Sequence, residues 1–330
     1  MTGQQIDGVL VQWGERLFYP SNRSVKSLPT PRLDTLMRRK AAVIRLRIEA
    51  TVRRVPQVMV KVTGGGRGMA AIAAHFRYIS KNGRLDVEDD REVVRNGKEV
   101  VRDLVDQWRY SGSRIEEEGH RREAFNVMLS MPAGTNAELL QKAAREFAHV
   151  ELAGHRYVMV LHEHQANPHV HLSVKAEAAS GKRLNPRKAD LHRWRETFAE
   201  KLRGWGIEAE ATRQATRGES RNDEPLWRLK AKVDGRLRQQ PATARADSQA
   251  SRAGADAMVS WAHILKALAA SDVERDRELA RRIGSFVRSS PVFKQTAARR
   301  LGPDASLIRV PATAITHGAP MTKPDRQIER

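Results

Sequence analysis

Two short runs rich in β-branched and apolar residues, RYVMVLHEH (156–164) and HVHLSVKAE (169–177), are separated by only four residues, 165–168. Runs of this length and composition are typical of β-strands. A connection this short favours a hairpin, so we expect the two strands to be antiparallel neighbours. This pairing constrains the fold more than any other feature, because it requires a sheet with antiparallel neighbours.

The same hairpin gathers histidines. Four of the eleven histidines of the chain lie within residues 162–171. Alternate residues of a strand face the same side, so His169 and His171 share a face, and the turn brings His162 beside them. Three converging imidazoles suit a divalent metal with open coordination positions. The alternative is an edge hairpin whose histidines face solvent or bond to protein groups.

The segments around the hairpin predict an α+β fold. Strands are expected in PQVMVKVTGG and AFNVMLSMP. Helices are expected in GMAAIAAHFRYISKNG, at 97–110, at 136–150, and from Pro186 through RKADLHRWRETFAEKLRGWG. The GGGRG segment at 64–68 lacks the Lys-Ser/Thr of a nucleotide-binding loop, and we interpret it as a flexible turn that lets the backbone approach DNA phosphate.

Composition changes along the chain predict four regions. Residues 1–55 form a basic N-terminal arm, in which Leu36, Ala41, Ile44 and Ile48 mark an amphipathic helix. Residues 56–215 hold the alternating strands and helices, 216–256 read as a polar linker, and 257–330 as a small helical region with a flexible basic tail. Helices are expected there at 257–270 and 272–288.

Charge and cysteine content narrow the function classes. The chain has 59 Lys and Arg against 39 Asp and Glu, a net charge of +20, which favours nucleic acid as a partner. It has no cysteine, which excludes a disulfide scaffold, a thiolate zinc finger, an iron–sulfur cluster and a cysteine nucleophile. No apolar run is long enough to span a membrane and no secretory signal is evident, so we expect a cytoplasmic protein without membrane insertion.

A metal in a basic protein suggests phosphodiester chemistry, which requires a nucleophile. The four tyrosines all precede the histidine pair. Tyr78 lies near the end of an expected helix, between Arg77 and Lys81, whose positive charges would favour a phenolate and attract phosphate. Tyr157 begins the strand that leads to His162 and is expected to pack in the core. The alternative for Tyr78 is an ordinary residue of an amphipathic helix.

Three segments, KVTGGGRGMAAIAAHFRYISKNG, NVMLSMPAGT and VLHEHQANPHVHL, resemble in this order the three motifs of the conjugative and mobilisation relaxases. These enzymes are HUH endonucleases, named for a histidine pair that matches His169-Val170-His171 here. Relaxases place the nucleophile before that pair, whereas rolling-circle initiators and single-tyrosine transposases place it after. The resemblance covers about residues 57–215.

The resemblance implies a mainly antiparallel sheet flanked by helices and assigns the site. Tyr78 would be the nucleophile, and His162, His169 and His171 would hold Mg²⁺ or Mn²⁺. Ser130 would help to hold DNA beside the cleavage site; its alternative is a hydroxyl that stabilises a turn. Many relatives carry a carboxylate where this chain has His164. The general base is therefore left open between four candidates: Glu163, His164, His75 or a metal-bound hydroxide.

The implied activity is site- and strand-specific nicking at a transfer origin, through a 5′-phosphotyrosine that can be religated. Expected partners are single-stranded DNA at that origin, accessory DNA-binding proteins and a coupling protein. The alternatives are a non-catalytic DNA-binding accessory protein and a metal hydrolase of a small substrate. Besides Ser130, we expect DNA contacts from basic side chains near Tyr78 and after the histidine strand: Arg67, Arg77, Lys81, Arg183, Arg187 and Lys188.

Overall fold

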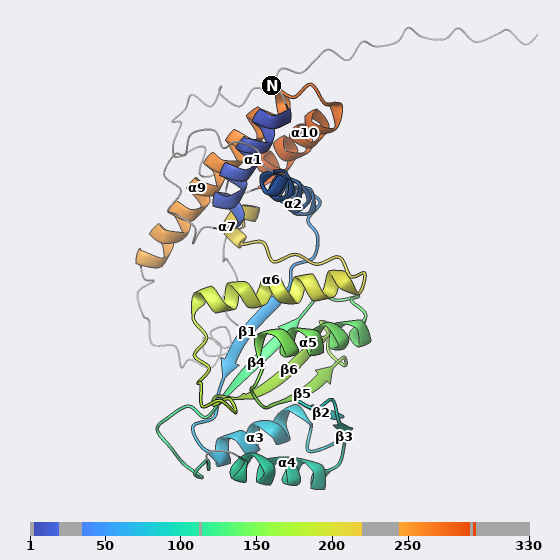
Figure 1. Ribbon diagram of the computed structural model, residues 1–330, viewed down its shortest axis with the longest axis vertical. Helices are drawn as coiled ribbons and strands as arrows, with labels where there is room; N and C mark the ends of the chain where they lie inside the picture. The colour runs from blue at the N-terminus through green and yellow to red at the C-terminus, as the bar shows by residue number, and fades with distance from the viewer. Residues whose placement is uncertain (1–2, 20–34, 112–113, 220–243, 291–292, 295–330) are drawn as a thin grey trace, which may run out of the picture.

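The computed structural model describes residues 3–19, 35–111, 114–219, 244–290 and 293–294 (Figure 1). Its centre is a six-stranded sheet with the order β1-β4-β6-β5-β2-β3. Every pairing in the sheet is antiparallel, which confirms the α+β class. The strands are β1 (Met59–Gly64), β2 (Val87–Asp89), β3 (Val94–Arg95), β4 (Ala124–Ser130), β5 (Tyr157–His162) and β6 (His169–Lys175).

The β5–β6 pair is the hairpin that the sequence predicts. Its register pairs Tyr157 with Val174 at one end and His162 with His169 at the other. The connection therefore comprises residues 163–168, longer than the expected four residues, because β5 already ends at His162. The metal candidates thus lie at the closed end of the hairpin.

One face of the sheet packs against α5 (Ala137–Glu151) and α6 (Lys188–Gly204). Val170 and Leu172 point to this side and join Phe147, Trp194 and Phe198 in one buried cluster. Full burial of such a side chain contributes roughly 1.5–3 kcal/mol. Because side chains alternate along β6, His169 and His171, which flank Val170, face the opposite side of the sheet.

That opposite side is partly covered by α3 (Met69–Ile79) and α4 (Lys98–Tyr110). Val158 and Val160 of β5 pack there with Phe76 of α3 and Trp108 of α4. The two aromatic rings meet edge to face, with centroids 4.9 Å apart. Helix α3, which carries Tyr78, is thereby fixed against the strands that carry the histidines.

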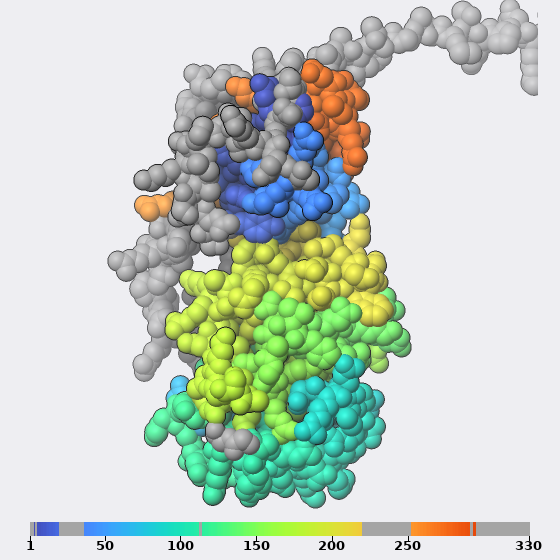
Figure 2. Space-filling model, viewed as in Figure 1, coloured from blue at the N-terminus to red at the C-terminus, as the bar shows by residue number. Residues whose placement is uncertain are grey.

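A second core lies in a helical unit made of α1 (Gly3–Phe18), α2 (Thr35–Val52), α9 (Ala244–Ala269) and α10 (Glu274–Ser289), with the short α7 (Gln214–Arg217) beneath it. Leu10, Ile44, Trp261 and Ile283 are buried together there. Figures 1 and 2 show this unit stacked beyond α6, on the far side of the sheet from α3 and α4. The N-terminal helices α1 and α2 therefore share one core with α9 and α10.

The helical unit differs from the sequence expectations in three ways. Ala41, Ile44 and Ile48 are buried, but Leu36 is 60% exposed and does not belong to the apolar face. Helix α1 was not expected, and its buried residues pack with α2 and α9. Helix α9 begins at Ala244, inside the expected linker. The rest of that linker, 220–243, and the tail beyond 294 lie outside the described residues, and the region boundaries stay predictions.

Candidate active site

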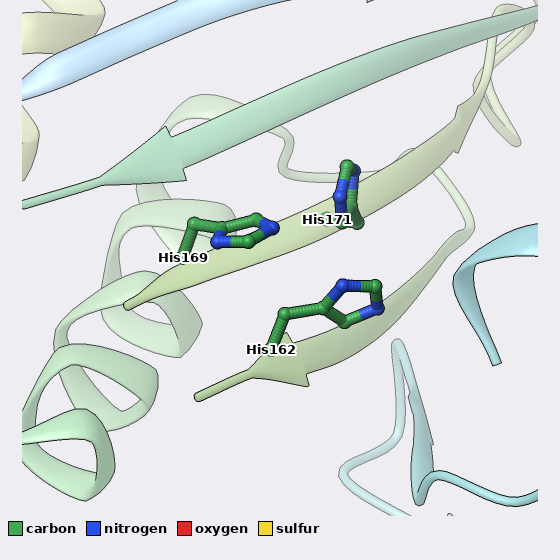
Figure 3. Close-up of side chains that lie close together, drawn as sticks. All are labelled: His162, His169 and His171. Carbon is green, nitrogen blue, oxygen red and sulfur yellow. The ribbon is translucent and has the colours of Figure 1, made fainter. Parts of the chain in front are cut away.

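The three histidines meet on the side of the sheet that faces α3 (Figure 3). His162 lies opposite His169 across the strand pair, and His171 is two residues further along β6. Their ring centroids lie 4.7–5.0 Å apart. One nitrogen from each ring lies within 4.8 Å of the others, and all three side chains are buried. The structure thus brings the sequence-predicted triad together.

Hydrogen bonds fix which nitrogen of each ring is available. The Nε2–H of His162 donates to the carbonyl oxygen of Ile79, 2.6 Å away, and the Nδ1–H of His169 donates to the carbonyl of Asn167 at 3.0 Å. Each of these rings then keeps a lone pair on its other nitrogen. Nδ1 of His171 is buried without a hydrogen-bond partner among the described residues. An unpartnered buried nitrogen is costly, and this donor set fits a divalent metal.

The protonation states of His171 and His162 also suit a divalent metal. Burial, with the neighbouring His162, His169 and His75, lowers the pKa of His171 to about 3. Burial also lowers the pKa of His162, against the opposing effect of its bond to Ile79. Both imidazoles are therefore neutral near pH 7, which is the form that binds metals.

Tyr78 lies beside this triad. Its ring centroid is 6.3 Å from that of His171, and its side chain is 70% exposed. Tyr110 is similarly exposed but lies at the end of α4, and Tyr19 packs against the helical unit. Tyr157 is buried, which raises its pKa to about 12. Of the four tyrosines, Tyr78 alone combines exposure with proximity to the triad.

Local structure holds Tyr78 in place. Helix α3 ends one residue later, at Ile79, whose side chain is buried and whose carbonyl accepts the bond from His162. The chain then turns through three residues with positive φ, Lys81, Asn82 and Gly83. A Cβ at Gly83 would collide with the backbone of Gly97, so only glycine fits this turn. The helix that carries the nucleophile candidate is thus tied directly to a triad ring.

The link between His162 and Ile79 joins residues 83 positions apart, and sequence reasoning missed it. No sequence signal identifies a backbone carbonyl as a partner. The contact exists because α3 crosses the end of β5, which only the packed fold specifies.

The candidates for the general base lie on two sides of the triad. Glu163 and His164 are exposed in the β5–β6 connection, and the ring centroid of His164 lies 5.1 Å from that of His162. His75, on α3, lies 6.4 Å from the rings of both Tyr78 and His171. Its buried Nδ1 has no hydrogen-bond partner among the described residues, and burial lowers its pKa to about 4. Glu163, His164 and His75 therefore all remain candidates for the general base.

The expected DNA contacts near Tyr78 are available to solvent. Arg77 and Lys81 are exposed on either side of it, and Arg67 is exposed in the glycine-rich segment. Ser130 is buried, lies opposite His169 in the sheet, and donates its hydroxyl to the carbonyl of Pro168 at 3.2 Å. That bond matches the turn-stabilising alternative for Ser130, and its contact with DNA stays a prediction.

The expectation of a flexible glycine turn at 64–68 is wrong. The carbonyl of Gly66 accepts hydrogen bonds from the backbone of Glu123 and Ala124. A Cβ at Gly65 would collide with the carbonyl of Ala124, and one at Gly68 with the backbone of Glu117. Glycine is needed at these positions because two backbone segments pack closely. The loop is therefore fixed by its backbone contacts and is not a flexible turn.

Arg183, Arg187 and Lys188 are not brought to the triad. Arg183 forms ion pairs with Glu123 and Glu177, and Glu177 follows β6 at the end remote from His169. Arg187 and Lys188 are exposed at the start of α6, which covers the other face of the sheet. The sequence cluster that suggested a groove is therefore divided between an ion-pair network and a helix start.

Residues 78–207 match the family model described as "Relaxase: MobA/VirD2-like, nuclease domain". This chain carries a mobilisation relaxase nuclease domain. The matched part of the relaxase domain begins at Tyr78 and includes all three triad histidines. Among the described helices of the chain, none is long and apolar enough to span a bilayer.

Curated relatives of the relaxase domain are T-DNA border endonucleases VirD2. The protein of Agrobacterium fabrum is 25% identical over 183 residues, covering 49% of this chain and 41% of that protein. The protein of Rhizobium radiobacter is 24% identical over 183 residues, covering 49% and 43%. That of Rhizobium rhizogenes is 24% identical over 141 residues, covering 38% and 32%. The chain spans less than half the length of each of these relatives.

Proposed function

We propose that this protein is a metal-dependent DNA nickase that cuts one strand at a specific site in a transfer origin and so initiates conjugative mobilisation. The observation that carries the proposal is the exposed Tyr78 ring 6.3 Å from His171, beside three histidines whose nitrogens converge. The relatives named as T-DNA border endonucleases support the same class of reaction. The nuclease unit is proposed to span residues 56–215.

In this proposal Tyr78 attacks the scissile phosphorus through its phenolic oxygen. The new bond joins that oxygen to phosphorus, and the bond from phosphorus to the 3′ oxygen of the neighbouring nucleotide breaks. The products are a 5′-phosphotyrosine and a free 3′-hydroxyl. Because one phosphate ester replaces another, the 3′-hydroxyl can attack in the reverse direction and religate the strand.

The chain's own residues support this step in three ways. His162, His169 and His171 would hold a divalent cation, Mg²⁺ or Mn²⁺, which when bound supplies Lewis-acid stabilisation of charge on the phosphate oxygens. Arg77 and Lys81 place positive charge beside the phenol and attract the phosphate. The phenolic proton passes to a nearby base, for which the protein candidates are Glu163, His164 and His75.

We propose single-stranded DNA at a transfer origin as the substrate, with accessory DNA-binding proteins and a coupling protein as partners in the cytoplasm. The net charge of +20 supports a polyanionic substrate.

The test is covalent trapping of the DNA. Wild type, Tyr78→Phe and Tyr110→Phe proteins are incubated with Mn²⁺ or Mg²⁺ and single-stranded oligonucleotides spanning candidate origins, and adducts are resolved on denaturing gels and mapped by peptide mass spectrometry. Tyr110→Phe is the matched control because Tyr110 is 68% exposed but lies outside the triad. We expect a metal-dependent adduct on Tyr78 in wild type and in Tyr110→Phe, and none in Tyr78→Phe.

Two results would contradict the proposal. An adduct on another tyrosine would keep the nuclease class but remove Tyr78 from the mechanism. Tight DNA binding without any adduct on a genuine origin would favour the alternative, a non-catalytic DNA-binding accessory protein.

A further inference from the structure

Helix α2 carries a second apolar stripe, on the side that faces away from the core of the helical unit. Its core side consists of Ala41, Ile44 and Ile48, which are buried. On the other side, Leu36 is 60% exposed and Leu46 is 62% exposed. They are the only exposed leucines in the part of the chain that the structure describes. A single exposed apolar residue is common on a protein surface, but these two lie along one side of one helix.

The spacing of this stripe is that of a coiled coil. Its residues follow one another at alternating steps of three and four positions, which is the heptad spacing of a helix that packs along another helix. This heptad stripe consists of Leu36, Arg39, Val43, Leu46 and Ala50 of α2, followed by Arg53. Val43, between the two leucines, is 51% exposed. The three aliphatic side chains are therefore arranged for a partner helix while each is more than half exposed.

The heptad stripe borders a cleft between α2 and α6. The cleft has a volume of about 560 Å³. Its apolar lining comes from both units: Val43, Leu46 and Ala50 of α2, and Ala199, Ile207 and Ala209 of α6 and the segment that follows it. Figure 1 shows α2 at the end of the helical unit that faces α6. A helix that lies along the stripe thus has a place for a large apolar side chain beside Leu46.

The charges beside the stripe select the kind of partner. Helix α2 contains five arginine and lysine residues and one glutamate. Arg38 and Arg39 are exposed and form no ion pair within the described residues. An acidic helix complements these cations, whereas a second copy of α2 would bring like charges together. The row of aliphatic side chains favours a protein helix over DNA, because DNA is bound mainly through polar contacts to its phosphates and sugars.

We infer that the heptad stripe binds an acidic amphipathic helix of a partner protein, which packs along Leu36, Val43 and Leu46 and places an apolar side chain in the cleft. The α6 side of the cleft carries Glu196 and Glu200. The acidic residues of the partner therefore lie on the opposite side, toward the N-terminal cations of α2. The stripe precedes the residues proposed as the nuclease unit, so this inference does not depend on the nickase proposal.

The test uses a designed peptide as the probe. The peptide is a labelled helix of three heptads with leucine at positions a and d and glutamate at positions e and g, and a control peptide has lysine at e and g. Binding to the full chain is measured by fluorescence anisotropy. We expect the acidic peptide to bind, and the basic peptide to bind at least about 10-fold more weakly.

Variants of the protein locate the binding surface. Leu46→Glu is expected to weaken binding of the acidic peptide by about 10-fold or more, because Leu46 lies in the stripe and borders the cleft. The matched control is Val150→Glu, since Val150 of α5 is 57% exposed and lies outside the stripe; its affinity should stay within about 2-fold of wild type. Arg39→Gln should weaken binding about 3-fold at low salt and less at high salt. The thermal midpoints of all three variants should equal that of wild type.

Several results would overturn the inference. Absence of binding by the acidic peptide, or equal affinities of wild type and Leu46→Glu, would show that the stripe does not bind such a helix. A wild-type dimer in sedimentation velocity that Leu46→Glu dissociates would assign the stripe to a second copy of this chain. Binding of oligothymidylate or of anionic phospholipid vesicles that is weaker in Leu46→Glu than in Val150→Glu would assign it to DNA or to a membrane surface.

Discussion

Positive charges have different partners in the helical unit and around the triad. In the helical unit, Arg45 contacts the carboxylates of Asp7 and Asp276. Arg47, whose side chain is only 12% exposed, contacts Glu210 across the boundary with the nuclease unit. These arginines neutralise acidic groups and hold helices together. Their charge is not available to a ligand.

Around the triad the cations have no such partners. Lys61, Arg67, Arg77 and Lys81 are all exposed, and none forms an ion pair within the described residues. The net charge of +20 therefore indicates a polyanionic partner but not its position. We propose the position from the exposed cations that lie beside the candidate nucleophile, Arg77 and Lys81. The comparison predicts that substitutions in the helical unit cost stability, whereas those near the triad cost metal binding, DNA affinity and rate.

The largest effect is expected at the triad itself. His171→Ala removes one of three ligands, and we expect Mn²⁺ affinity to fall by about 100-fold or more and adduct formation to be lost. Isothermal titration calorimetry and the trapping assay measure the two losses. Chelation of metal from wild type should abolish the adduct, and added Mn²⁺ should restore it. His120→Ala, at an exposed loop position, is the control; unchanged Mn²⁺ binding in His171→Ala would exclude the triad as the metal site.

Substitutions in the helical unit are expected to lower stability and to leave DNA affinity unchanged. Arg47→Met removes the ion pairs with Glu196 and with Glu210, which is 5% exposed and keeps only Arg203 as a cation. We expect this loss to cost about 1–3 kcal/mol of unfolding free energy. Urea denaturation measures that loss, while oligothymidylate affinity at low temperature should stay at the wild-type value. Arg39→Met, at an exposed position, serves as the control. A fall in DNA affinity without a loss of stability would mean that Arg47 binds DNA.

Removal of the C-terminal helices is a related case. Trp261 of α9 is fully buried and donates its indole N–H to the carbonyl of Thr216, and α1 and α2 share its core. A chain truncated at residue 215 would expose that core. We therefore expect lower solubility and a lower thermal midpoint, measured by scanning calorimetry, whatever the tail contributes to DNA or partner binding. An unchanged midpoint would show that α1 and α2 are stable without α9 and α10.

Much of the sheet was predictable because its signals are local. Apolar runs of the right length marked β1, β4, β5 and β6, and the short polar segment before His169 marked the hairpin. The helical unit was not predictable in the same way. Helix α1 packs against α9, whose residues lie more than 200 positions later. Nothing in either segment alone indicates the other, because the contact arises only when the chain has folded.

The candidate site was likewise predictable where its signals are local, and not where they depend on residues distant in sequence. The spacing of His169 and His171 predicts one shared face, and the hairpin adds His162. The cluster Arg183, Arg187 and Lys188 is not gathered at the triad, because proximity in sequence does not specify ion-pair partners: Glu123, which binds Arg183, lies 60 residues earlier. Its contact with DNA stays a prediction.

Buried histidines make the metal-free protein sensitive to acid. The pKa of His75 is lowered to about 4 by burial, against an ordinary value of about 6.5. Between these values the unfolded chain binds more protons than the folded chain, so stability is complete above about pH 6.5 and falls as the pH drops. We expect His75 to contribute about 1–2 kcal/mol of this loss at pH 5. Denaturation of wild type and His75→Phe at pH 7 and pH 5 should show a smaller loss in the variant; an equal loss would contradict the assignment.

The smallest effect is expected from the cation next to the nucleophile. Lys81 has a positive φ of 49°, so Lys81→Asn removes the charge while keeping a residue that tolerates this conformation. We expect adduct formation with Tyr78 to slow by about 3- to 10-fold, because one exposed charge near a phosphate contributes about 1 kcal/mol. The thermal midpoint should not change.

Arg281→Gln is the matched control for Lys81→Asn, because Arg281 is an exposed cation of the helical unit that pairs with Glu274. Single-turnover trapping compares the rates at two salt concentrations. A rate deficit in Lys81→Asn that shrinks as salt rises would identify an electrostatic effect on the phosphate. If Arg281→Gln slowed the reaction as much, the cations of the two regions would be equivalent toward DNA, and the presence of a carboxylate partner would not distinguish structural from functional charge in this fold.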